Sequence, residues 1–205
     1  MTHPTIELIE KRVSANRFDP THNLTEAEIT ELVRLATRAP TAYNLQNWRF
    51  IAVRTSEAKA KLCELAYGQA KVADAAVTFI ICGQKPDHTS LAERLYPFVE
   101  SGHMPLDMAT AWQENVRASY PVDSEAARDE AIRSATFGVA TLIHAAEAKD
   151  LVSGPMVEFD ADAVAVEFEL RQDEIPVMLL PVGRPAPGNW PQKPRRPLSE
   201  VLQFS

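Results

Sequence analysis

The spacing of apolar residues predicts a first clear helix between Thr25 and Pro40. Thr25 and Glu28 have the spacing of a capping box, in which each side chain bonds the other residue's backbone N–H. The apolar residues that follow recur at i, i+3, i+4 and i+7, which places them on one helix face: Ile29, Leu32, Val33 and Ala36. Pro40 cannot continue a helix, so we expect the helix to end before it.

The next part of the chain predicts two strands separated by a helix. Arg49–Arg54 is a short run rich in apolar and β-branched residues, and Ala75–Cys82 is a continuous apolar run of the kind found in buried strands. Between them, Ser56 to about Ala66 has helical spacing, with Leu62 and Leu65 directed inward.

The second half of the chain predicts a mainly helical stretch and one further strand. We expect residues 91–119 to form two helices that break near Ser101-Gly102. Ser124 is placed to cap a long helix and Asp160 a short one. The run Ile175–Gly183 predicts a third strand, with prolines near both of its ends.

A length of 205 residues suits one domain, which we expect to span residues 1–205. No repeat or low-complexity block divides the chain. Residues 185–205 are rich in proline and basic residues, so we predict an extended C-terminal tail that wraps a neighbouring subunit.

Composition narrows the class of protein. The chain has 21 Lys+Arg against 28 Asp+Glu, a formal net charge of -7 that disfavours nucleic acid and anionic membranes as partners. No apolar stretch is long enough for a membrane span or a secretory signal. The two cysteines, Cys63 and Cys82, form no CxxC motif. We therefore expect a cytoplasmic protein.

Several common chemical motifs are missing from the sequence. There is no GxGxxG, GxxxxGK, HExxH or GxSxG, and the five histidines show no metal-ligand spacing. The sequence therefore predicts neither a glycine-rich phosphate loop of these kinds nor a metal site.

Four separated segments of the chain carry polar residues that form one pattern. They are residues 12–18 (RVSANRF), 39–50 (APTAYNLQNWRF), 67–75 (YGQAKVADA) and 154–160 (GPMVEFD). Together these segments resemble the nitroreductase family of FMN enzymes. Their order and spacing match the family over nearly the whole chain, least securely from about residue 87 to residue 129.

In the first segment, the resemblance implies a site for the FMN phosphate. Arg offers a planar fork of donors to a phosphate, and a hydroxyl adds a compact one. The family commonly has another basic residue where this chain has Asn16, so Arg17 or the C-terminal basic residues would supply the missing charge. The implied phosphate-binding residues are Arg12, Val13, Ser14 and Asn16, with Lys193, Arg195 and Arg196 from the tail.

The second and third segments would contact the isoalloxazine ring. Thr41, Ala42 and Asn44 match the family loop that faces the flavin, although Ala42 lacks the usual hydroxyl. Gln69 would bond the pyrimidine edge, and Lys71 would lie near N1 and O2, where a cation stabilises the reduced ring. Without the motif, the favoured interpretation of Lys71 is a solvated lysine at a helix end.

The fourth segment would offer backbone N–H groups to flavin N5, so no titrating catalytic side chain is expected. Pro155 and Met156 would pack against the ring, and the backbone of Val157 and Glu158 would support N5. The family often has Glu-Gly at these last two positions. Replacing the glycine restricts the turn and leaves open whether the Glu158 amide faces the ring.

By resemblance, the fold is α+β, with a central mixed sheet flanked by helices and an intertwined homodimer whose FMN sites lie at the interface. The implied reaction is ping-pong transfer of hydride from NADH or NADPH, through flavin N5, to a small oxidised acceptor of nitroaromatic or quinone type. The acceptor pocket would draw on Tyr96, Phe98 and Tyr120. The alternatives are a non-catalytic flavin-binding or sensing protein, or another flavin reaction such as reductive dehalogenation or oxygen-dependent flavin cleavage.

Overall fold

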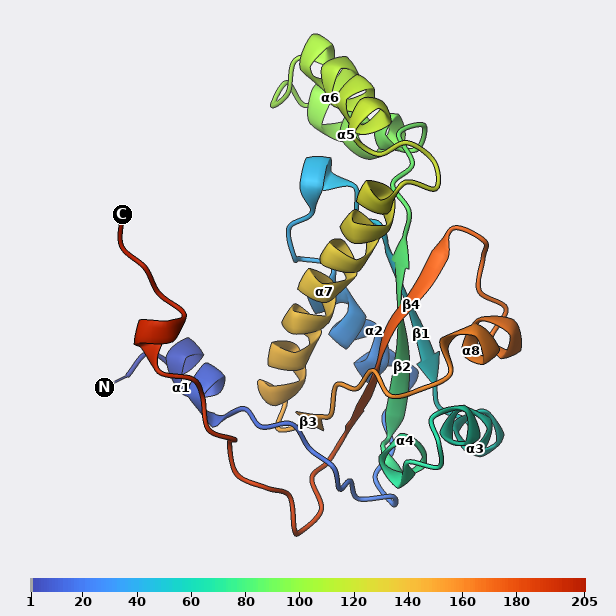
Figure 1. Ribbon diagram of the computed structural model, residues 1–205, viewed down its shortest axis with the longest axis vertical. Coiled ribbons are helices and arrows are strands. Elements are labelled where there is room, and N and C mark those ends of the chain that lie inside the picture. Colours follow the sequence, from blue (N-terminus) through green and yellow to red (C-terminus); the bar gives the residue numbers. More distant parts are fainter. Residues whose placement is uncertain (1) are drawn as a thin grey trace.

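The computed structural model describes residues 2–205, which form a central sheet covered by helices on both faces (Figure 1). The sheet has four strands in the order β1-β2-β4-β3. These strands are β1 (Trp48–Val53), β2 (Val77–Gln84), β3 (Val152–Ser153) and β4 (Glu174–Gly183). The helices are α1 (Pro4–Lys11), α2 (Glu26–Ala36), α3 (Ser56–Leu65), α4 (Ala70–Asp74), α5 (Leu91–Glu100), α6 (Leu106–Ser119), α7 (Glu125–Glu147) and α8 (Ala161–Glu167), with 3-10 turns η1 (Ala42–Asn44) and η2 (Leu198–Glu200).

The predicted helix starts are confirmed at the level of single hydrogen bonds. Thr25 and Glu28 form a complete capping box, and the side chains of Ser124 and Asp160 accept bonds from backbone N–H groups in the first turns of α7 and α8. The break between α5 and α6 falls at the predicted Ser101-Gly102. The three predicted strands form, with bounds that differ by one or two residues.

Helix α1 was outside the sequence-based prediction, although the sequence carries a signal for it. Pro4 occupies the first turn, where its missing N–H costs nothing, and the His3 ring accepts a bond from the Thr5 N–H at 3.2 Å. None of the residues of α1 is buried in the core. The sequence therefore has no core-facing apolar stripe of the kind that predicts the other helices.

Both faces of β2 are buried, which explains its unbroken apolar sequence. Phe79 and Ile81 belong to the core formed with α2 and α7, whereas Ile80 and Cys82 belong to the core formed with α3 and α8. Successive strand residues point to opposite faces, so one run supplies both cores.

The sheet is antiparallel, not mixed as the resemblance predicts. Each pair of adjacent strands in the described residues runs antiparallel, and the parallel contact there is an isolated bridge between Ser14 and Ser153. Helix α7, with 23 residues, returns the chain along the sheet, and α8 with its loops leads back to the start of β4 beside the end of β2. That route makes β4 antiparallel to β2.

Helices α5 and α6 project beyond the sheet (Figure 1) and have a small core of their own. Leu91, Leu95 and Val116 are buried in it, together with Leu45 from the η1 turn. At the opposite end, the C-terminal tail runs away from the body beside α1. Among the described residues, no helix combines the length and the apolar character that crossing a bilayer requires.

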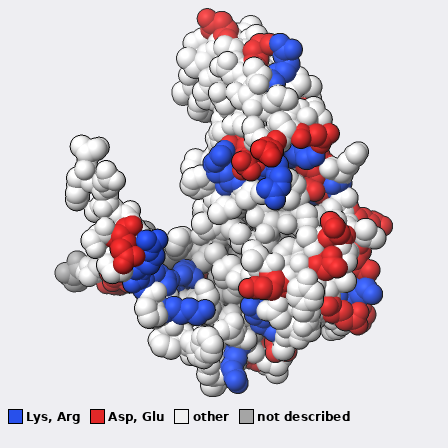
Figure 2. All heavy atoms as spheres, viewed as in Figure 1, with Lys and Arg blue, Asp and Glu red and all other residues white. Residues whose placement is uncertain are grey.

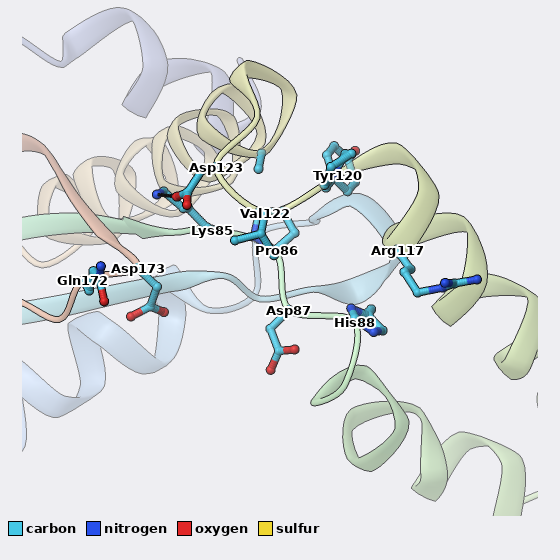
Figure 3. Close-up of a pocket in the computed structure, with 12 residues that line it drawn as sticks. Lys85, Pro86, Asp87, His88, Arg117, Tyr120, Val122, Asp123, Gln172 and Asp173 are labelled. Carbon is cyan, nitrogen blue, oxygen red and sulfur yellow. Dashed lines mark hydrogen bonds and ion pairs between the residues drawn. The ribbon is translucent and has the colours of Figure 1, made fainter.

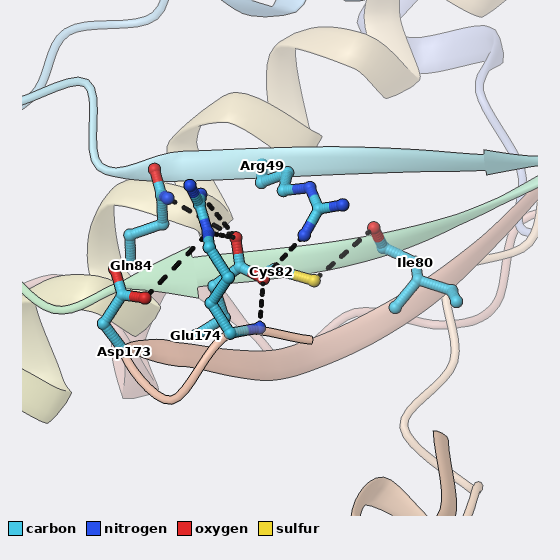
Figure 4. A network of polar contacts seen from close by, with 7 residues as sticks. Arg49, Ile80, Cys82, Gln84, Asp173 and Glu174 are labelled. Carbon is cyan, nitrogen blue, oxygen red and sulfur yellow. Dashed lines mark hydrogen bonds and ion pairs between the residues drawn. The ribbon is translucent and has the colours of Figure 1, made fainter. Parts of the chain in front are cut away.

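An ion-pair network around the buried carboxylate of Glu174 fixes the start of β4 to the end of β2 and the start of β1 (Figure 4). The Glu174 side chain has no exposed surface and accepts bonds from Arg49 at 2.8 Å and from Arg171 at 2.7 and 3.0 Å. Burial alone would raise the pKa of Glu174, but these bonds and one from the Arg171 backbone outweigh it and lower the pKa.

Candidate functional site

The first and fourth sequence segments lie side by side in the folded chain. The Ala15 N–H donates to the Ser153 carbonyl at 2.9 Å, next to the bridge between Ser14 and Ser153. A Cβ on Gly154 would lie 2.3 Å from the Ala15 carbonyl oxygen, so this approach requires glycine. The pairing sets Ser14 beside Pro155 and Glu158 around one cavity.

Strand β4 holds the fourth segment from the other side. Gly154 donates to the Pro181 carbonyl at 3.0 Å, and Met156 exchanges two backbone bonds with Leu179 at 2.9 and 3.0 Å. Met156 is buried in the core near Leu179. Met156 therefore fills core space and does not line the cavity.

The third segment reaches the same cavity through a tight turn. Tyr67 and Gly68 both have positive φ, at 57° and 73°, and the Gly68 N–H donates to the Cys63 carbonyl at 2.8 Å. After the turn, the Gln69 carboxamide donates to the Glu158 carbonyl at 2.9 Å. Lys71 follows in the first turn of α4 and lines the cavity.

The resulting cavity has a volume of about 580 Å³. It is lined by residues of the first, third and fourth segments and of the tail: Ser14, Ala15, Asn16, Arg17, Gln69, Lys71, Gly154, Pro155, Glu158, Gly188, Trp190 and Lys193. The volume is in the range of small-molecule and cofactor sites. Figure 2 shows Lys and Arg side chains gathered where the tail leaves the body.

The cavity is cationic although the chain as a whole is acidic. Arg17, Lys71 and Lys193 line it against one carboxylate, Glu158. Burial lowers the pKa of Lys71, Glu158 acts in the opposite direction, and Lys193 lowers it further. Lys193 also lies over the Trp190 ring, 5.6 Å from its centroid. This donor set, with the Ser14 hydroxyl and the Gln69 amide, suits a phosphorylated ligand that also has a polar ring edge.

The predicted cofactor residues fall into three groups. Ser14, Asn16, Gln69, Lys71, Pro155, Glu158 and Lys193 line the cavity together. Arg12 and Arg195 lie next to it: Arg12 donates to the Ser14 hydroxyl at 3.4 Å, and Arg195 lines an adjoining recess of about 130 Å³ with Ser14 and Lys193. The remaining residues are outside its lining: Val13, Thr41, Ala42, Asn44, Met156, Val157 and Arg196.

The second segment lies apart from the cavity within one chain. It forms the η1 turn, which packs against α5 and α6, with the Tyr43 ring 5.6 Å from the Trp112 ring. Tyr43, Asn44 and Gln46 have φ of 51°, 57° and 48°, a left-handed conformation that non-glycine residues seldom adopt. The Thr41 hydroxyl accepts the Gln46 N–H at 3.0 Å and helps to hold this strained turn.

The turn at Val157 and Glu158 does not need the glycine that the family often has there. Neither residue has a positive φ, so a side chain is tolerated at both positions. The Glu158 carboxylate bends back and accepts the Val157 N–H at 3.2 Å.

Sequence reasoning missed the contribution of the tail between residues 186 and 192. Gly188 and Trp190 line the cavity, and Gln192 donates to the Arg12 carbonyl at 3.0 Å. The Gly188-Asn189 pair is typical of a tight turn and was the available signal. The hydrogen bond from Asn189 to Arg17 joins residues 172 positions apart, so no local sequence pattern could predict it.

A larger cavity, of about 720 Å³, lies at the base of the α5–α6 projection (Figure 3). Lys85, His88, Arg117 and Tyr120 line it, with three aspartates and none of the predicted cofactor residues. Of the predicted acceptor-pocket residues, Tyr120 lines this cavity, whereas Tyr96 and Phe98 are exposed on α5. The mixed charge of this larger cavity points to no single class of ligand. The smaller cavity is the candidate site, because the first, third and fourth sequence segments meet there.

Comparison with known proteins gives one family. The model of the nitroreductase family matches residues 9–184. "Putative NAD(P)H nitroreductase YodC" of Bacillus subtilis (strain 168) is 28% identical over 198 residues, covering 96% of each chain. A protein named NADH dehydrogenase of Thermus thermophilus is 30% identical over 199 residues, which cover 97% of this chain and 93% of that protein.

Solved structures share the fold over the full length. A "putative nitroreductase" of Exiguobacterium sibiricum, crystallised in complex with FMN, superposes with a TM-score of 0.90 at 24% identity, covering 100% of this chain and 99% of that one. A second structure, YdfN of Bacillus subtilis, has a TM-score of 0.90 at 26% identity and covers 98% of both chains. The α+β fold is thereby confirmed.

Proposed function

Because this chain belongs to the nitroreductase family, we propose that it is an NAD(P)H-dependent flavin oxidoreductase that holds FMN in the cationic cavity. The observation that carries the proposal is the convergence of Ser14, Gln69, Lys71 and Lys193, from three distant parts of the chain, on one cavity. Cations with hydroxyl and amide donors are the groups that an FMN phosphate and a flavin edge require.

The cavity residues divide by the part of the cofactor that they suit. Arg17 and Lys193, with the Ser14 hydroxyl and with Arg12 behind it, suit the phosphate, and Arg17 supplies the charge that Asn16 lacks. Gln69 and Lys71 suit the ring edge. When bound, FMN accepts hydride at N5 from NADH or NADPH and passes it in ping-pong order to a small oxidised acceptor such as a nitroaromatic or a quinone.

A homodimer would complete the site. In one chain the η1 turn carries Thr41, Ala42 and Asn44 away from the cavity, so we propose that these residues reach the flavin of the partner subunit. The surface supports association: apolar side chains are exposed on the tail, at Leu198 and Phe204, and on α7, at Phe137. The tail would wrap the partner, because all of its residues from 191 to 205 are exposed on their own chain.

The acceptor pocket is proposed to draw on the α5–α6 projection. Tyr96, Phe98 and Leu106 on this projection are 61%, 57% and 69% exposed, and exposed apolar side chains gathered on one element can mark an interaction surface. In a dimer such a projection can reach over the neighbouring site, where aromatic side chains would favour flat, apolar acceptors.

The visible spectrum of the purified protein and the identity of its released chromophore test the cofactor. We expect bound FMN, or uptake of FMN by the apoprotein. Rapid anaerobic mixing with NADH and with NADPH then tests turnover, since an enzyme bleaches the flavin quickly and a flavin-storing protein does not. A colourless protein that takes up no FMN refutes the proposal, and a flavin that stays oxidised favours a storage or sensing role.

A further inference from the structure

The side chain of Asn189 joins the C-terminal tail to the first segment of the site through four hydrogen bonds. Its carbonyl oxygen accepts the N–H of Asn16 at 2.8 Å and that of Arg17 at 2.9 Å. Its amide nitrogen donates to the Arg17 carbonyl at 2.8 Å and to the Ala186 carbonyl at 3.1 Å. Both ends of the carboxamide are therefore used, which an aspartate, leucine or alanine cannot reproduce.

The backbone on each side is shaped for this contact. Ala186 donates its N–H to the Arg17 carbonyl at 3.1 Å, and Gly188 has a φ of +94°. A Cβ on Gly188 would lie 3.3 Å from Cδ and Nε of Arg17, so the Arg17 side chain rests on the bare backbone of this turn. The turn thus holds both the backbone and the guanidinium stem of Arg17.

Two consequences follow for the cavity. The N–H groups of Asn16 and Arg17 are committed to Asn189, so an anion there has to be bound by side chains and not by a nest of backbone amides. The turn also fixes where the tail begins its path along the cavity, which Trp190 and Lys193 line together with Arg17.

We propose that Asn189 is a positioning residue for phosphate recognition. It does not line the cavity, but its hydrogen bonds fix Arg17 and the start of the tail that carries Lys193, and both cations line the same cavity. This inference rests on the proposed function, because it takes the phosphate of FMN as the anion. Its specific consequence is that Asn189 determines how strongly the protein prefers FMN over riboflavin, which has the same ring and no phosphate.

Titration of apoprotein with FMN and with riboflavin tests this role. Asn189→Ala should weaken FMN binding about tenfold or more while changing riboflavin binding less than about threefold, since charged hydrogen bonds to the phosphate are lost. Asn115→Ala, the same change at an exposed position on α6, is the matched control and should leave both affinities unchanged. A purely structural role would weaken both ligands equally, and that result overturns the proposal.

The remaining outcomes are also decisive. An unchanged FMN affinity in Asn189→Ala overturns the inference while leaving the proposed function intact, whereas wild-type protein that binds neither flavin refutes the proposed function itself. If riboflavin binds too weakly to measure, FMN affinity at rising salt replaces it: the variant should lose part of the wild-type salt dependence, and an identical slope contradicts the proposal. If Asn189→Ala fails to fold, Asn189→Ser keeps a hydroxyl that can accept one of the two N–H bonds and adds no charge, and it should show the same selective loss for FMN; an equal loss for both flavins overturns the proposal.

Discussion

Gly154 offers a direct test of whether close packing of the first and fourth segments builds the site. In Gly154→Ala, the new Cβ would lie 2.3 Å from the Ala15 carbonyl oxygen, 0.7 Å short of the 3.0 Å below which such contacts essentially do not occur. The position of this Cβ is fixed by the Gly154 backbone, and the atom that it meets is a backbone carbonyl oxygen, so no side-chain rotation can relieve the clash. The two segments have to separate, and the bond from Ala15 to the Ser153 carbonyl lengthens with them.

The expected effect has two parts. Overpacking of a close backbone contact costs about 1 to 3 kcal/mol of unfolding free energy, and in a chain of this length about 2 to 4 °C of melting temperature accompanies each kcal/mol. We therefore expect the apoprotein to melt about 2 to 12 °C lower. Because the displaced residues line the cavity, FMN affinity should also fall, by roughly tenfold or more.

Gly83→Ala is the matched control, because its Cβ would lie 2.4 Å from the Ala131 carbonyl oxygen, an equally close backbone clash. Gly83 is on β2 against α7 and lines none of the cavity. Differential scanning fluorimetry of both apoproteins measures stability, and fluorescence titration with FMN below the melting range measures affinity. We expect similar losses of stability and a loss of affinity confined to Gly154→Ala. Equal affinities in the two variants would show that the approach of the segments does not position the cofactor groups.

Four further predictions follow from single contacts. Glu174→Gln should cost about 1 to 2 kcal/mol at pH 7, because hydrogen bonds to a charged group are lost while both partner arginines stay partly exposed to water. Because the native pKa of Glu174 is lowered, wild type has this stabilisation above a pH of about 4.3 and loses it as pH falls; equal urea midpoints at pH 7 would contradict the prediction. Lys71→Met should lower the flavin midpoint potential by roughly 30 mV, as a cation beside the reduced ring is lost, and an unaltered potential in spectroelectrochemistry would remove Lys71 from the ring. Arg12→Ala should weaken FMN binding by about 1.5 to 3 kcal/mol, and unchanged titration would exclude Arg12 from the site. Burial raises the pKa of Cys82 to about 12, so a thiol reagent should label only the half-buried Cys63 in native protein; labelling of both at equal rates would contradict the buried position.

The predicted cofactor residues that meet in the folded chain come from the first, third and fourth segments and from the tail. Ser14, Gln69, Lys71 and Glu158 occupy motif positions, and all four line the cavity. Thr41, Ala42 and Asn44 also occupy motif positions, yet one chain cannot bring them to that cavity. A motif reports residue types and spacing, and it does not say whether the segments that carry it meet within one folded chain.

Along the chain, the sequence determined what depends on near neighbours. The caps at Thr25, Ser124 and Asp160 and the apolar run at residues 77–82 were legible because a helix turn or a strand face is set by residues a few positions apart. The direction of the strand pairs, the contact of Gly154 with Ala15 and the four bonds of Asn189 depend on segments that lie far apart in the chain. Only the folded backbone decides such contacts, because they depend on the path of every intervening element and leave no periodicity in the sequence.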